Sequence, residues 1–211
     1  MILKIFAILL FSVLSGCADA QKTARLPEDK NILIVYLSRT RNTEALAGII
    51  HQNTGGTKVA IEVQSPYPED YKAIVEQVRQ ENETGFLPHL KTEIKDIEKY
   101  DVVFIGFPTW GMQLPPPVKS FLNRYDLSGK TIIPFNTHAG YGVGSGFQNI
   151  QELCPNSTVS EGFSTRGGVE RDGILYVMEG EKEKEVQAEV RKWLQKIDFP
   201  VKAPLPSPKN K

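Results

Sequence analysis

Three short segments, each directly after an apolar run, carry residue types that can hold a small ligand. Segment 38–43 reads Ser-Arg-Thr-Arg-Asn-Thr and precedes a predicted helix, whose first unpaired N–H groups bind anions. Segments 108–111 and 137–142 add an indole, a phenol ring and glycines, which let backbone approach a planar ring closely. We therefore predict a phosphate site beside a ring site. The candidate binding residues are Ser38, Arg39, Thr40, Arg41, Asn42, Thr43, Pro108, Thr109, Trp110, Gly111, Thr137, Gly140, Tyr141 and Gly142.

Each segment also has an ordinary structural explanation. Asn42 or Thr43 can cap a helix, Trp110 can pack in the core or on the surface, and the glycines after Thr137 can form a flexible connection. Segment 38–43 lacks the glycine–lysine pattern of nucleoside-triphosphate loops and the three-glycine pattern of dinucleotide sites. The three segments together, each at the end of a predicted strand, favour a ligand site.

Apolar runs alternate with helical stripes along the chain. The runs at 32–37, 102–107 and 131–135 are almost uninterrupted, which is typical of strands covered by helices on both faces. Alternating Val59, Ile61 and Val63 predict one edge strand, and 158–163 predicts another. The four helical stripes are Leu46, Ile49 and Ile50; Tyr71, Ile74, Val75 and Val78; Val118, Phe121, Leu122 and Tyr125; and Val186, Val190, Trp193, Leu194 and Ile197.

This alternation predicts an α/β fold, a three-layer sandwich with a five-stranded parallel sheet in the order 2-1-3-4-5. In such a sheet, ligands bind beyond the carboxyl ends of the strands, near the point where the strand order reverses. The strands predicted to end near Leu37, Phe107 and Thr137 lead directly into the three candidate ligand-binding segments.

The N-terminus predicts export and anchoring. Lys4 precedes about ten apolar residues, too few to span a bilayer. The Leu-Ser-Gly-Cys junction that follows resembles the lipobox of bacterial lipoproteins, whose cysteine is acylated; an ordinary signal peptide cut elsewhere is the alternative. We expect the domain on the periplasmic or outer side of a membrane of the bacterial cell envelope. The expected segments are a signal peptide (1–16), a lipidated Cys17 with its tether (17–30), one domain (31–199) and a disordered Pro/Lys tail (200–211).

Composition narrows the function classes. Lys plus Arg and Asp plus Glu number 25 each, so no basic surplus supports nucleic-acid binding. Two cysteines exclude a disulfide framework and a four-cysteine metal site. After removal of 1–16, Cys154 would be the remaining thiol, and we expect it to be a small buried core residue.

The three candidate ligand-binding segments and the sequence around them resemble the flavodoxin family, and specifically its bacterial flavodoxin-like lipoprotein branch. The resemblance runs from about Ile32 to Pro155, most of the predicted domain. The matching stretches are 34–40 with Asn42 and Thr43, 65–71 (Ser-Pro-Tyr-Pro-Glu-Asp-Tyr), 100–110, 121–122 and 126–135.

The resemblance implies FMN as the cofactor. In flavodoxins, the loop matching 38–43 wraps the phosphate, chiefly through hydroxyls and backbone N–H groups. The loops matching 108–111 and 137–142 sandwich the isoalloxazine ring. Trp110 matches a position where an aromatic residue often stacks on the ring, and Tyr141 is a weaker match.

Two departures accompany the resemblance. The family usually reads Thr-Gly-Asn-Thr in the phosphate loop, and here Arg41 replaces the glycine, at a cost of roughly 1 kcal/mol if φ is positive there. Alternatively, the positive charge of Arg41 contributes to phosphate binding. Soluble flavodoxin shuttles are strongly acidic whereas this chain is near neutral, so steering toward a basic partner is weak and we expect a different redox partner.

The expected function is FMN-dependent electron transfer at a membrane, with a redox protein or a small molecule as electron acceptor. An FMN-dependent NAD(P)H:quinone-type reductase remains an alternative, because the flavin needs no protein nucleophile. A binding module that has lost FMN is a second alternative, which Arg41 favours. His138, in the third segment, is a candidate for proton delivery. Segment 164–181 has no assigned role.

Overall fold

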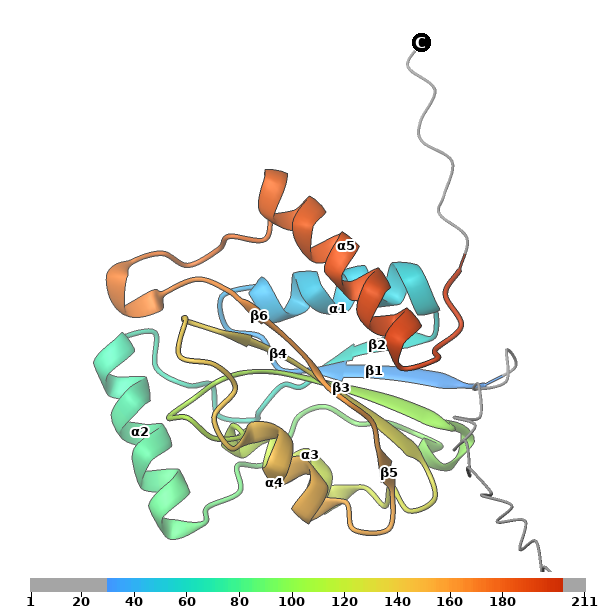
Figure 1. The fold of residues 1–211 in the computed structure, drawn as a ribbon. Coiled ribbons are helices and arrows are strands. Elements are labelled where there is room, and N and C mark those ends of the chain that lie inside the picture. The colour runs from blue at the N-terminus through green and yellow to red at the C-terminus, as the bar shows by residue number, and fades with distance from the viewer. Residues whose placement is uncertain (1–29, 203–211) are drawn as a thin grey trace, which may run out of the picture.

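The computed structural model describes residues 30–202 (Figure 1). The expected signal peptide, Cys17 and most of the tether lie outside the described residues, as does the tail from residue 203 onward. Within the described part, no helix is long and apolar enough to cross a membrane.

The sheet is parallel and has the predicted order. The fifth position is shared by two short strands, β5 and β6, which both pair with β4. Across the sheet the strands are β2 (Thr57–Ala60), β1 (Ile32–Tyr36), β3 (Val102–Pro108), β4 (Thr131–His138), and then β5 (Thr158–Val159) with β6 (Phe163–Arg166).

Five helices and two 3-10 turns connect the strands in the described chain. They are α1 (Asn42–Thr54), α2 (Tyr71–Thr84), η1 (Ile97–Lys99), α3 (Pro116–Arg124), α4 (Gly146–Leu153), η2 (Glu170–Asp172) and α5 (Gly180–Lys196).

Two hydrophobic layers sandwich the sheet. One face of β1, β3 and β4 packs against α1 and α5, and the other packs against α3 and α4 (Figure 1). Neighbouring residues of one strand point to opposite layers, so Phe104 lies in the α1/α5 layer while Ile105 lies in the α3/α4 layer. This double burial is why the central strands read as continuous apolar runs.

Several local predictions need correction. The edge strand predicted at 158–163 is interrupted after Val159 and resumes at Phe163 as far as Arg166. Helix α4 was not predicted, because the glycine run that leads into it obscures its short apolar face. In the stretch predicted as an alternating edge strand, Val63 lies beyond β2 and forms an isolated bridge with Leu90.

The predicted stripe of α2 is only half buried. Ile74 and Val78 are buried, whereas Tyr71 and Val75 are exposed. In Figure 1, α2 stands beyond the carboxyl ends of the strands rather than against the middle of the sheet. Asp70 caps its start by accepting the Ala73 N–H at 2.8 Å.

The first residues of the predicted tail pack onto the domain. Val201 lies against the α1/α5 layer, and the Lys202 N–H donates to the Asn53 carbonyl at 2.7 Å. Cys154 is buried in the α3/α4 layer, as predicted, and burial raises the pKa of its thiol to about 11.

Gly106 provides a test of the core. It pairs with Phe135 of β4, and a Cβ at Gly106 would lie 2.1 Å from the Phe135 ring. We expect Gly106→Ala to lower the free energy of unfolding by about 1–3 kcal/mol in urea denaturation, because the ring must move. The control is Gly48→Ala in α1, where a Cβ meets nothing within 4 Å; it should stabilise by about 0.5–1 kcal/mol. Equal effects of the two changes would contradict this packing.

Candidate functional site

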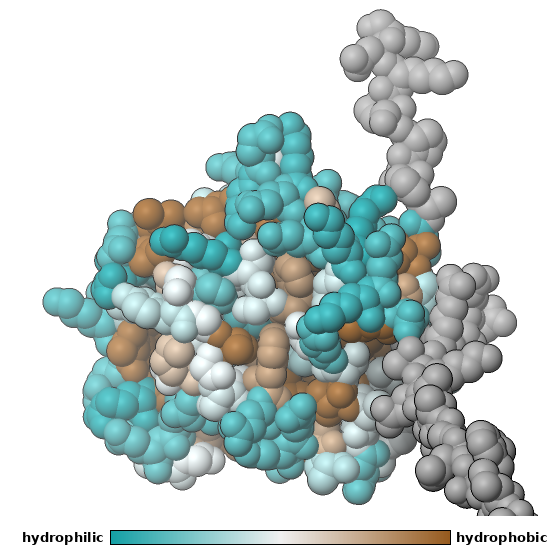
Figure 2. All heavy atoms as spheres, viewed as in Figure 1, coloured by the Kyte–Doolittle hydropathy of each residue, from teal (hydrophilic) through white to brown (hydrophobic). Residues whose placement is uncertain are grey.

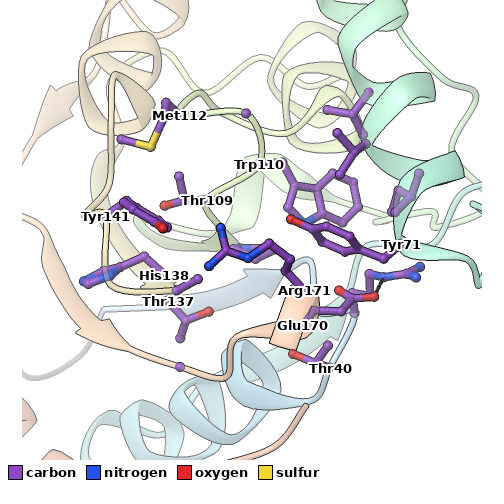
Figure 3. Close-up of a pocket in the computed structure, with 18 of the residues that line it drawn as sticks. Thr40, Tyr71, Thr109, Trp110, Met112, Thr137, His138, Tyr141, Glu170 and Arg171 are labelled. Carbon is purple, nitrogen blue, oxygen red and sulfur yellow. Dashed lines mark hydrogen bonds and ion pairs between the residues drawn. The ribbon is translucent and has the colours of Figure 1, made fainter. Parts of the chain in front are cut away.

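A cavity of about 560 Å³ opens at the carboxyl ends of β1, β3 and β4, within the size range of small-molecule sites (Figure 3). Trp110 and Tyr141 lie on opposite sides of the open space. Ten of the fourteen predicted residues line it: Arg39, Thr40, Asn42, Pro108, Thr109, Trp110, Gly111, Thr137, Tyr141 and Gly142.

The other four predicted residues lie behind or beside the wall. The Ser38 hydroxyl accepts the Glu44 N–H at 3.2 Å, which caps the first turn of α1. Thr43 is buried, and its hydroxyl pairs with that of Thr137 at 2.8 Å. The Gly140 N–H donates to His138 Nδ1 at 3.0 Å.

Arg41, the fourth of these residues, has a left-handed backbone. Its φ is 65°, the region that favours glycine. Its guanidinium points away from the cavity and lies 5.1 Å from the centre of the Tyr176 ring, a cation–π contact. The arginine charge therefore lies beside the α1/α5 layer, against which Tyr176 packs.

Arg39 and Asn42 hold a neighbouring segment in place. Arg39 pairs with Glu170 at 2.7 Å, and its other two nitrogens donate to the carbonyls of Pro68 and Glu69. Asn42 donates to the Leu175 carbonyl at 2.6 Å and accepts the Val177 N–H at 3.1 Å, besides donating to Thr40 Oγ1. These side chains thus fix 167–177 over the start of α1.

Segment 167–171 forms one wall of the cavity, although its sequence does not indicate a role. Its glycines are explained by close approach. A Cβ at Gly167 would lie 3.3 Å from Asn42, and one at Gly168 would lie 2.4 Å from the carbonyl oxygens of Ile174 and Leu175. The Arg-Gly-Gly sequence indicates that this backbone packs closely against another segment. The neighbouring residues in the sequence do not indicate which segment that is.

The two ring-side loops are joined by Thr109. Its N–H donates to the Thr137 carbonyl at 2.9 Å, and its hydroxyl donates to the Gly142 carbonyl at 2.9 Å. The fully buried Asn136 supports the same corner by donating to the Phe107 carbonyl at 2.9 Å. Both walls are thereby set in position by hydrogen bonds.

Trp110 both packs and faces the cavity. The Tyr67 ring meets it edge-on, with ring centres 5.2 Å apart, and the Tyr67 hydroxyl donates to Glu81 of α2 at 2.5 Å. Burial, with Glu81 beside it, raises the pKa of Tyr67, so its hydroxyl stays a donor. The Ser-Pro-Tyr-Pro-Glu-Asp-Tyr stretch therefore supports Trp110 and provides the acceptors for Arg39.

Arg171 extends across the mouth of the cavity from segment 167–171 (Figure 3). Its guanidinium contacts Asp172 at 3.0 Å and interacts with the Tyr141 side chain, and both raise its pKa. Tyr141 itself is two-thirds exposed. This side of the cavity is open to solvent.

His138 lines the cavity beneath the third segment. Burial, together with the charges of Arg166 and Lys182, lowers the pKa of its ring. The neutral form is therefore favoured at pH 7, with Nδ1 accepting the Gly140 N–H and the proton on Nε2. Proton delivery by this residue stays a prediction.

The role of Asn42 is open to a direct test. We expect Asn42→Ala to lower the free energy of unfolding by about 1–3 kcal/mol, because the Leu175 carbonyl and the Val177 N–H lose their hydrogen bonds to the buried Asn42 side chain. Trypsin should then cleave after Arg171 faster. The matched control is Asn53→Ala, a buried asparagine of the same helix that bonds within α1. Cleavage of Asn42→Ala at the wild-type rate would contradict the role in holding the segment.

Comparison with known proteins agrees with this geometry. A model of the flavodoxin family matches residues 31–180. A proposed flavoprotein of Bacteroides eggerthii aligns with 80% of this chain and 98% of its own, at 26% identity and a TM-score of 0.65. One from Bacteroides uniformis aligns with 79% and 98%, at 22% identity and a TM-score of 0.64.

More distant likeness extends to a flavoprotein from Lactobacillus acidophilus solved in complex with FMN. It aligns with 69% of this chain and 98% of its own, at 21% identity and a TM-score of 0.58. No curated protein matches the chain. Since the family model covers well over half of the sequence and the sheet has the order 2-1-3-4-5, this chain belongs to the flavodoxin family.

Proposed function

We propose that the cavity binds FMN and that the protein transfers electrons through it at a membrane of the bacterial cell envelope. The observation that carries the proposal is the meeting of three strand-end loops, one at a helix start and two bearing aromatic rings, around one cavity. When bound, FMN supplies the electron-transfer chemistry, and the protein supplies binding, orientation and electrostatics.

The donor set at the start of α1 fits a phosphate group. Ser38 takes the Glu44 N–H, and Arg41, the residue before the helix, makes no side-chain capping bond within the described structure, so the N–H groups of Asn42 and Thr43 remain for an anion. Thr40 lines the cavity, and its oxygen accepts from Asn42 at 2.8 Å, which leaves the hydroxyl hydrogen to donate outward. Because Arg39 is paired with Glu170, neutral donors and the helix dipole would hold the phosphate.

The opposite end fits a planar ring. Trp110 and Tyr141 supply two aromatic surfaces, and Gly111 and Gly142, both at positive φ, let the loops bend around them. Arg41 adopts the left-handed φ that glycine favours, so the arginine at this position does not by itself argue for loss of the cofactor.

Anchoring through Cys17 is the second part of the proposal. Parallel strands place the start of β1, where the tether arrives, at the end of the sheet opposite the cavity (Figure 1). A lipid on Cys17 would therefore be linked to the end of the sheet opposite the cavity, which leaves the cavity accessible to an electron donor or acceptor.

Substitutions at the ring end and at the phosphate end of the site should have different effects on flavin binding. Trp110→Ala should weaken FMN binding by about 1–3 kcal/mol, the range for lost aromatic stacking, and should raise flavin fluorescence. It should also raise the second reduction potential, because water then solvates added negative charge on the ring. Thr40→Val should weaken FMN but leave riboflavin, which lacks the phosphate, almost unchanged.

Fluorescence titration with FMN and riboflavin, together with spectroelectrochemistry, provides these measurements. Wild-type affinity, quenching and potentials in Trp110→Ala would show that the indole only packs against Tyr67. An equal loss of FMN and riboflavin binding in Thr40→Val would contradict the phosphate assignment.

Anchoring predicts that Cys17→Ser abolishes fatty-acid labelling and releases the protein from the membrane fraction of the producing bacterium. Metabolic labelling followed by fractionation measures both. A labelled, membrane-bound Cys17→Ser protein would refute the lipid assignment. Cys154→Ser is the control, since Cys154 is buried in the domain and should not affect either result.

A further inference from the structure

Helix α2 forms a side of the cavity that none of the three loops provides. Residues along nearly its whole length line the space, from Tyr71 to Glu83. At 1.5 Å per residue this wall is about 18 Å long. The cavity therefore continues past the proposed ring site, between α2 and the turn from Trp110 to Gln113.

The α2 side of the cavity is apolar and open to solvent. Val75 is 49% exposed, Tyr71 38% and Met112 46%, and all three line the same hollow. Figure 3 shows the Tyr71 side chain beside Trp110, and Figure 2 shows apolar surface at this end of the molecule. Scattered exposed apolar residues are ordinary, but several converging on one concavity indicate a binding site.

The charged side chains that line this part of the cavity are already in ion pairs. Arg79 contacts Glu76 and Glu83 on α2, and Arg39 contacts Glu170. A charged ligand would have to compete with these pairs. The lining therefore favours an uncharged occupant.

One end of the hollow offers hydrogen-bond donors. Asn82 accepts from Lys119 Nζ at 2.8 Å through its Oδ1. Its Nδ2 would lie 3.9 Å from a Cβ at Gly111, on the cavity wall. An amide N–H₂ at the end of an apolar channel is a suitable partner for a carbonyl oxygen.

We propose that the α2 groove, formed by Tyr71, Ile74, Val75, Val78, Asn82 and Met112, binds a flat, uncharged aromatic carbonyl compound of the quinone class. The role of this compound as electron acceptor rests on the proposed function. A quinone is reduced at its two carbonyl oxygens by two electrons and two protons, the number that one fully reduced FMN gives up on returning to its oxidised form. A cavity of small-molecule size fits such a compound better than it fits a protein surface.

The test uses the oxidised, FMN-loaded protein titrated with menadione by calorimetry, so that binding is measured without turnover. Val75→Lys should weaken menadione binding at least tenfold, because a charge then lies in the groove. Leu153→Lys is the matched control: an exposed apolar residue at the end of α4, outside the cavity, given the same charge. It should change menadione affinity less than twofold.

A second variant tests the carbonyl contact. Wild-type protein should bind menadione more tightly than 2-methylnaphthalene, which has the same rings without carbonyl oxygens. Asn82→Leu should remove most of that difference. Since Asn82 and Val75 lie on the same helix, circular dichroism checks that both variants keep α2.

The outcomes separate this inference from the proposed function. Failure to load FMN would refute the proposed function before menadione is added. With FMN loaded, absence of menadione binding, or equal effects of Val75→Lys and Leu153→Lys, would overturn the quinone groove. Weaker FMN binding in Val75→Lys would also overturn it, because α2 would then cover the flavin itself.

Discussion

Thr137, at the carboxyl end of β4, joins the three loops on which the candidate site depends. Its hydroxyl pairs with that of Thr43 at the start of α1, and its carbonyl accepts the N–H of Thr109 beyond β3. Thr137 is buried, so each of these bonds is costly to leave unmade. The loops are therefore held at fixed spacing by the protein itself, and a ligand would not have to order them.

Arg39 and Asn42, in the segment after β1, also hold a distant part of the chain in place. In sequence, both belong to segment 38–43, which is predicted to bind a phosphate group. In the structure, their side chains hold the connection between β6 and α5 against that segment. The connection in turn places Glu170 and Arg171 at the cavity. A site assembled in this way couples the start of α1 to a segment more than 120 residues later in the chain.

The fold was largely predictable because strong local patterns and topology agree. Continuous apolar runs predicted β1, β3 and β4, and the order of strands followed from the alternation with helices. Short-range signals failed where a residue's environment is decided by distant partners. Tyr71, Ile74, Val75 and Val78 have the spacing of a core stripe, but all four line the cavity, and spacing cannot tell a face turned to the core from one turned to a cavity. Arg41 likewise has a predictable backbone, but its contact with Tyr176 depends on a segment far along the chain.

The central claim is that the loops joined by Thr137 form a site for FMN, and its most direct test is a fluorescence titration of FMN into the wild-type chain freed of bound flavin. The account predicts saturation at one FMN per chain, with quenching of the flavin by the aromatic walls and weaker binding of riboflavin. Flavin fluorescence that stays unchanged as protein is added in excess would contradict it.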